Sequence, residues 1–109
     1  MLAKRKIKIC GITRKDEIIG INKLQVDYVG FIFAPSKRQL SPFQARELIK
    51  LLNPRIKAVG VFVNENIDKV NEIVDYCNLD IVQLHGDETN DDCLKVSRPV
   101  WKSVAIKDR

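Results

Sequence analysis

One cysteine in this sequence lies where a thiol could do chemistry. Segment 7–10 alternates apolar and polar residues like a short strand, and Cys10 is its last residue. Gly11 follows and lets the backbone turn, and Thr13 with Asp16 fits a capping box at the start of a helix. The pattern therefore predicts a thiol at the carboxyl end of a strand, where ligands and catalytic groups gather in α/β folds.

Two interpretations of Cys10 stay open on the local sequence. A single buried cysteine is commonly a small apolar core residue, whereas an ionised thiol can act as a base or nucleophile. Lys8 lies two positions earlier on the same face of the strand, roughly 7 Å away. Its ammonium group would favour the thiolate, or it would pair with an acidic group in the interior for structural reasons.

The strand that carries Cys10 is the first of five apolar runs. We expect the other strands over 28–33, 57–63, 81–86 and 99–104, each separated from the next by a segment with helical spacing. Alternating strands and helices predict a parallel sheet with right-handed crossovers. Two architectures fit this pattern: a small flavodoxin-like open sheet, or the first half of a (β/α)8 barrel, whose whole form needs roughly 200 residues or more.

The helices are expected to begin at residues typical of helix N-termini. A first helix would run from about Arg14, and Ser41 with Pro42 predicts the start of the second. Asn64 is a candidate cap for the third, and the acidic pair 87–88 favours the start of a short fourth helix. The side chains expected to pack in the core from the first three helices are Ile18, Ile19, Ile21, Ala45, Leu48, Ile49, Leu52, Ile67, Val70, Ile73, Val74 and Cys77.

Composition restricts the class of protein. The 109 residues are 45% hydrophobic and 30% charged, which suits one globular unit, and they contain no apolar run long enough to span a membrane. The basic segment 1–6 lacks the apolar stretch of a secretion signal. A formal charge of +5 favours an anionic partner, but the basic residues are dispersed and no nucleic-acid motif accompanies them. Neither nucleic acid nor a membrane is therefore an expected partner.

The cysteines and glycines predict neither a metal ion nor an organic cofactor. Cys10, Cys77 and Cys93 are far apart in the sequence and form no Cys-x-x-Cys pair. Cys77 fits the apolar stripe of the third helix, and Cys93 is expected to pack against the sheet or lie near the surface. No Gly-x-Gly-x-x-Gly follows the first strand, which argues against a dinucleotide site. Free thiols are typical of a reducing cytoplasm.

Five segments of the chain form a set: Lys-Ile-Cys-Gly-Ile-Thr at 8–13, Gly-Phe-Ile-Phe at 30–33, Ser-Lys-Arg at 36–38, Gly-Val-Phe-Val-Asn at 60–64 and Gln-Leu-His-Gly-Asp-Glu at 83–88. Taken together, they resemble the phosphoribosylanthranilate isomerase family of tryptophan biosynthesis. They occur in the order and spacing of the family and span nearly the whole chain. The resemblance implies that residues 1–109 are a single incomplete domain, the amino-terminal part of a (β/α)8 barrel up to strand five.

The resemblance also implies an activity and its site. The family converts an aminoaldose, phosphoribosylanthranilate, into an aminoketose by an Amadori rearrangement without a cofactor. Cys10 matches the family's base, and Arg38 matches the arginine that meets the anthranilate carboxylate. His85 would lie at the same mouth, either lining the substrate pocket or bonded to a neighbouring loop. Gln83 is expected to make polar contacts inside the barrel.

Other parts of the family's machinery match no motif in residues 1–109. The family acid follows strand six and its phosphate loops follow strands seven and eight, and Asp108 is not assigned the role of the acid. We therefore expect a truncated isomerase, inactive alone, that self-associates or requires a carboxyl-terminal half. The alternatives are a non-enzymatic half-barrel that self-associates and binds an anionic ligand, and an unrelated flavodoxin-like domain.

Overall fold

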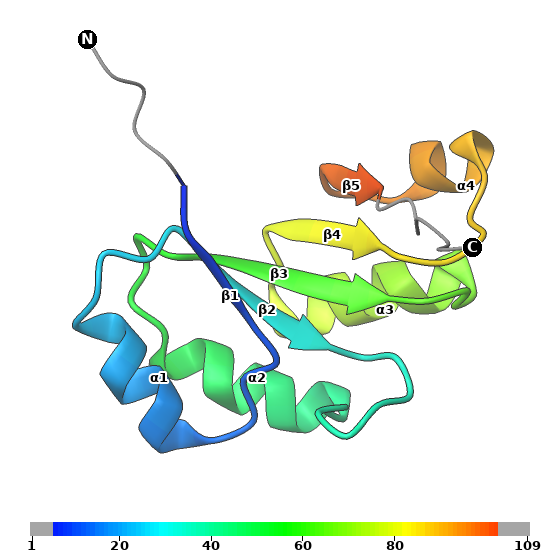
Figure 1. The fold of residues 1–109 in the computed structure, drawn as a ribbon. Coiled ribbons are helices and arrows are strands. Elements are labelled where there is room, and N and C mark those ends of the chain that lie inside the picture. Colours follow the sequence, from blue (N-terminus) through cyan, green and yellow to red (C-terminus); the bar gives the residue numbers. More distant parts are fainter. Residues whose placement is uncertain (1–5, 103–109) are drawn as a thin grey trace, which may run out of the picture.

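The computed structural model describes residues 6–102, in which strands and helices alternate (Figure 1). The elements are β1 (Lys8–Cys10), α1 (Lys15–Asn22), β2 (Tyr28–Ile32), α2 (Pro42–Leu51), β3 (Lys57–Phe62), α3 (Ile67–Cys77), β4 (Ile81–Leu84), α4 (Asn90–Lys95) and β5 (Val100–Lys102). All five expected strands form, and residues 103–104, expected in the last strand, lie outside the described residues together with Asp108. No helix between residues 6 and 102 is long and apolar enough to cross a membrane.

The strand order decides between the two expected architectures. The strands are parallel and lie in the order β1-β2-β3-β4-β5. Because every crossover joins neighbouring strands in the same direction, α1, α2 and α3 lie on one face of the sheet (Figure 1). A flavodoxin-like sheet would place its first strand inside the order and helices on both faces. The described chain is therefore built like the first part of a (β/α)8 barrel.

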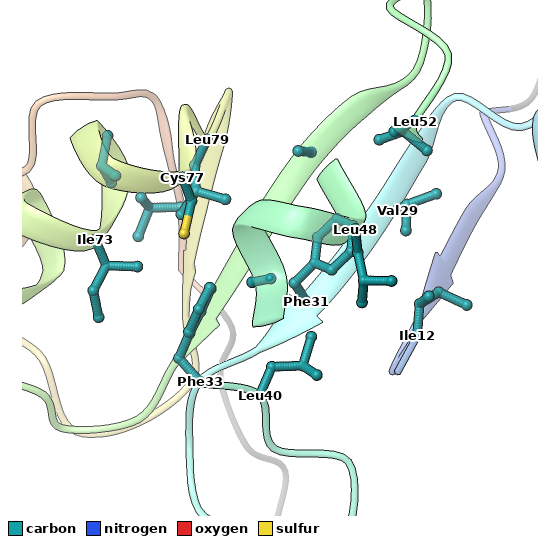
Figure 2. Packing of buried hydrophobic residues seen from close by; sticks show 14 of the residues in the cluster. Ile12, Val29, Phe31, Phe33, Leu40, Leu48, Leu52, Ile73, Cys77 and Leu79 are labelled. Atoms are coloured by element: carbon teal, nitrogen blue, oxygen red, sulfur yellow. The ribbon is translucent and has the colours of Figure 1, made fainter. Parts of the chain in front are cut away.

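The apolar core lies between the sheet and the helices. Val29 and Phe31 of β2 and Val82 of β4 are fully buried, and Figure 2 shows Phe31 beside Leu48 of α2. Ile73 and Cys77 of α3 lie at the other end of the same cluster (Figure 2). Alternation along the strands leaves the intervening residues for the opposite face. The helix-covered face thus holds the main apolar cluster, whereas the other face combines the buried Val59 of β3 with polar side chains such as Lys8 and Gln83.

Contacts across this other face show that the sheet curls. Strands β2 and β5 would lie roughly 14 Å apart in a flat sheet, yet the rings of Tyr28 and Trp101 meet edge to face with centroids 4.9 Å apart. Lys8 of β1 donates a hydrogen bond to Gln83 Oε1 of β4, and its Nζ lies 5.8 Å from the centroid of the Trp101 ring. The uncovered face is therefore concave, as the interior of a barrel is.

The first two helices begin close to where the sequence predicts, at Lys15 and Pro42. Ser41 Oγ accepts from the Gln44 amide, and the Gln44 side chain accepts from the Ser41 amide. The predicted cap at Thr13 is wrong, since Arg14 occupies the N-cap position of α1. Glu17 reaches back to accept from the Thr13 and Arg14 amides, each at 3.0 Å, and the hydrogen bond from Thr13 above all holds the pKa of Glu17 below its usual value.

The predicted starts of the third and fourth helices are also wrong. Asn66, not Asn64, caps α3 by accepting from two backbone amides, because Asn64 is in a left-handed conformation with φ 52°. Thr89 caps α4, so the acidic pair 87–88 lies before the helix rather than in its first turn. Ile19 is the one expected core contact that is exposed, at 54%, because it lies a third of a turn from the buried Ile18.

The neighbouring isoleucines of α1 make a matched test of this core. Ile18→Val should lower the free energy of unfolding by about 0.5–1.5 kcal/mol, since it removes a methyl group from a filled site. Ile19→Val, with the same chemical change on the exposed side, should alter it by less than about 0.5 kcal/mol. Urea denaturation followed by circular dichroism measures both, and equal losses would contradict this placement of α1.

Candidate active site at the carboxyl end of the sheet

Cys10 lies exposed on the concave face at the end of β1. Its register partner on β2 is Gly30, and a methyl group at Gly30 would lie 2.7 Å from Cys10 Sγ. The same methyl group would lie 3.2 Å from Lys8 Cε, so both side chains share the concave face, as the sequence predicts. The absence of a side chain at Gly30 makes the space that the thiol occupies. An exposed thiol on the uncovered face is not part of the apolar core.

Arg38 lies against the turn that follows Cys10. Gly11 has φ 88°, a conformation that favours glycine, and its carbonyl accepts a hydrogen bond of 3.0 Å from Arg38 Nη1. A methyl group at Gly11 would lie 2.8 Å from Arg38 Cδ. Lys37 and Arg38 line a cleft with Thr13, Arg14 and Glu17. The residue that follows Cys10 therefore binds the Arg38 guanidinium group. The N–H groups of Arg38 other than Nη1 can donate to an anion.

The Lys8 side chain passes above Gly30 beside Cys10 and reaches across the concave face. Its ammonium group donates to Gln83 Oε1 and lies over the ring of Trp101. The partner within the described residues is thus an amide oxygen rather than an interior acid, and the expected polar contact of Gln83 is confirmed. The effect of the Lys8 charge on the thiolate stays a prediction.

His85 follows β4 at the same end of the sheet. Its amide donates to Phe62 O at 2.9 Å, which continues the ladder beyond Leu84. Leu84 is fully buried in the helix-side core, so alternation directs the imidazole of His85 towards the concave face, where it is exposed. Within residues 6–102 no hydrogen bond ties this imidazole to a neighbouring loop, to Cys10 or to Arg38. The structure thus places Arg38 next to the turn that follows Cys10, whereas His85 lies at the end of β4.

Sequence analysis missed the role of Glu88, a buried carboxylate beside His85. The residue is 8% exposed, and its Oε2 accepts from the Asn64 amide at 2.6 Å while Oε1 accepts from the Gly86 amide at 2.8 Å. Lys102 Nζ lies 3.6 Å from Oε1 and also donates to Gly86 O at 2.6 Å. Glu88 thus joins the loops that follow β3 and β4 to the end of β5.

The surroundings of Glu88 keep it ionised. Burial alone would raise the pKa of its carboxyl group, but hydrogen bonds from its own amide and from those of Asn64 and Gly86, together with the charge of Lys102, hold the pKa below its usual value.

The sequence contains a signal that Glu88 lies before the fourth helix rather than in it. Thr89 and Asp92 have the spacing of a capping box, which places the helix start after Glu88.

The remaining cysteines are structural. Cys77 is buried, its thiol donates to Pro42 O at 3.3 Å, and burial raises its pKa to about 11, as befits the core residue that the sequence predicts. Cys93 is half-buried and packs against the core from α4. Among residues 6–102 no group of three or more His, Cys, Asp or Glu side chains is placed to hold a metal ion.

Comparison with known proteins points to a single family. A sequence model described as N-(5'phosphoribosyl)anthranilate (PRA) isomerase matches residues 7–109. The N-(5'-phosphoribosyl)anthranilate isomerase of Thermoanaerobacter sp. (strain X514) is 52% identical over 106 residues, which are 95% of this chain and 52% of that protein. The Clostridium acetobutylicum enzyme of the same name is 52% identical over 103 residues, 93% of this chain and 50% of that protein.

Solved structures agree with the sequence relatives. Phosphoribosyl anthranilate isomerase from Thermotoga maritima superposes with a TM-score of 0.86 at 41% identity, covering 89% of this chain and 49% of that one. A structure of such an isomerase in complex with reduced 1-(o-carboxyphenylamino)-1-deoxyribulose 5-phosphate gives a TM-score of 0.90 at 40% identity, covering 94% and 55%. The chain therefore spans about half the length of the relatives that it matches.

The space at Gly30 can be tested by filling it. Gly30→Ala should lower the free energy of unfolding by about 1–3 kcal/mol, because the added methyl group must displace Cys10 Sγ. The double variant Cys10→Ala/Gly30→Ala should recover most of that loss, since the displaced atom is gone. Gly20→Ala, where the added methyl group meets open space, is the matched control and should stabilise by about 0.5–1 kcal/mol. Denaturant unfolding of the four proteins would refute the assignment if the double variant were no more stable than Gly30→Ala.

Proposed function

The chain belongs to the N-(5'-phosphoribosyl)anthranilate isomerase family, and on that premise we propose that it carries the base and the anthranilate-side half of a phosphoribosylanthranilate isomerase site. The reaction of tryptophan biosynthesis that we assign to it is the Amadori rearrangement of N-(5-phosphoribosyl)anthranilate to 1-(2-carboxyphenylamino)-1-deoxyribulose 5-phosphate. It is an internal oxidation and reduction, so it needs no external electron carrier.

Cys10 is the proposed base. Once the ribose ring has opened to a Schiff base, a thiolate on the concave face removes the C2′ proton, and the resulting enolamine tautomerises to the ketone. The observation that carries this role is the exposed thiol at the end of β1, in space that Gly30 leaves free. A base must reach the proton it removes, and a thiol in the helix-side core would not.

Arg38 is the proposed anchor for the anthranilate carboxylate. Its hydrogen bond to Gly11 O fixes one edge of the guanidinium group next to the Cys10 turn. The other edge can meet a carboxylate through two parallel hydrogen bonds, which a lysine cannot offer. His85 is proposed to line the opposite side of the substrate pocket from the end of β4.

The ring-opening acid and the phosphate site match no motif in residues 1–109, and the relatives are about twice as long as the match. We therefore propose that residues 1–109 act as the amino-terminal part of a barrel that a second polypeptide segment completes. Without such a segment the thiol has no assigned partner acid, and no turnover is expected.

Turnover with and without a completing half tests the proposal. The chain alone should not consume phosphoribosylanthranilate, whereas residues 1–109 joined to the carboxyl-terminal half of the Thermoanaerobacter relative should do so, as followed by loss of substrate fluorescence. In the joined protein Cys10→Ala should lower kcat by about 10²- to 10⁴-fold, the contribution typical of a positioned base.

Cys93→Ala is the matched control, since it removes a half-buried thiol from α4, away from the concave face. It should leave kcat within about twofold of the unchanged joined protein, as substitutions outside the site commonly do. If Cys10→Ala were as active as Cys93→Ala, Cys10 would not be the base.

A second candidate function, a self-associating half-barrel, is favoured by the sheet edges. In the described chain β1 pairs with β2 alone and β5 with β4 alone, so each presents unpaired backbone groups. Exposed edges and an uncovered concave face favour pairing with another copy. Analytical ultracentrifugation of the chain should then show a dimer or larger species, while a monomer with a cooperative thermal transition would contradict it.

A further inference from the structure

We propose that Glu88 is a positioning residue for His85, holding the backbone from which the imidazole projects into the mouth of the site. The proposal rests on the proposed function for the statement that this mouth receives substrate. The geometry of the clamp does not depend on it. The clamp consists of Glu88, Lys102 and the backbone groups of Gly86 and Asn64 that they bind.

The backbone around His85 is fixed on both sides while its ring is free. The His85 amide donates to Phe62 O of β3 at 2.9 Å. Both backbone groups of the next residue are held, because the Gly86 amide donates to Glu88 Oε1 at 2.8 Å and Gly86 O accepts from Lys102 Nζ at 2.6 Å. A side chain with a fixed origin and an exposed ring is suited to contacting a ligand in one orientation.

The same carboxylate holds the loop that faces His85 from β3. Glu88 Oε2 accepts from the Asn64 amide at 2.6 Å, and Asn64 Oδ1 accepts from the Asp87 amide at 2.7 Å. A methyl group at Gly86 would lie 2.5 Å from Asn64 Oδ1, so the two loops touch. Asn64 is held in its left-handed conformation by this contact, which explains why it does not cap α3.

The charge and burial of Glu88 indicate a positioning role rather than ordinary helix capping. A carboxylate that is 8% exposed must be offset by hydrogen bonds and a nearby cation, and Glu88 has two loop amides and Lys102. None of these partners belongs to α4, whose own cap is Thr89. The groups that Glu88 stabilises all lie at the carboxyl ends of β3, β4 and β5.

His85 is the single histidine of the chain, so its ring can be observed directly. In ¹H–¹³C NMR spectra of the 109-residue chain, Glu88→Gln should move or broaden the His85 Cε1–H resonance by more than a linewidth. The reason is that the glutamine NH₂ cannot accept from the second amide. Thr89→Ala also weakens this region, by about 1 kcal/mol through loss of the α4 cap, but it leaves the clamp intact and should leave the resonance in place.

A second variant keeps the test informative if Glu88→Gln does not fold. Lys102→Met releases the Gly86 carbonyl while Glu88 stays, and it should shift the resonance in the same direction by a smaller amount. An unchanged resonance in the folded clamp variants, or an equal shift in Thr89→Ala, would overturn the proposal.

In the protein joined to a carboxyl-terminal half, Glu88→Gln should lower kcat/KM about 10- to 100-fold, as a small misplacement of a group that contacts substrate can do. Thr89→Ala should lower it less than threefold. Equal losses in the two variants would count against a positioning role for Glu88. Lack of turnover in the unchanged joined protein would refute the proposed function alone, because the NMR result on the 109-residue chain does not depend on activity.

Discussion

The contact between Lys8, Gln83 and Trp101 is the interaction on which the functional face depends. These residues come from β1, β4 and β5, and they meet across the concave side of a sheet in which β2 and β3 lie between β1 and β4. The amide oxygen and the aromatic ring compensate the ammonium charge that the curl brings inward. The contact thus joins strands that are not neighbours in the sheet, across its concave side.

The main apolar cluster and the candidate site residues lie on opposite faces of the sheet. Phe31 and Val82 are buried under the helices, while Cys10 and His85 lie on the other side with exposed side chains. Glycine serves the second face in two ways. At position 30 it leaves space beside the thiol, and at position 11 it allows the turn whose carbonyl holds Arg38. The positions of Cys10 and Arg38 therefore depend on two glycines, Gly30 and Gly11.

Periodicity predicted the strands, the buried stripe of α3 and the core position of Cys77, because these follow from local alternation and helical spacing. Periodicity gave the wrong answer where the position of a residue depends on contacts between segments distant in sequence. Ile18 and Ile19 are equally apolar, and only Ile18 is buried in the core cluster. Asn64 is a good cap in isolation, but contact with Gly86 holds it in a turn. Glu88 is acidic and precedes a helix, yet two of its partners are distant in sequence, Asn64 after β3 and Lys102 on β5.

The position of Trp101 has a consequence for the fluorescence of the chain. It is the single tryptophan of the chain, and it lies between Tyr28 and the ammonium group of Lys8 on the inner face. Its emission should therefore be sensitive to the water and charge around the concave surface, and little affected by the helix-covered core. A segment that closes over this surface would exclude water from the indole and shift the emission to shorter wavelength. The molecule thus carries an intrinsic fluorescent probe of barrel closure.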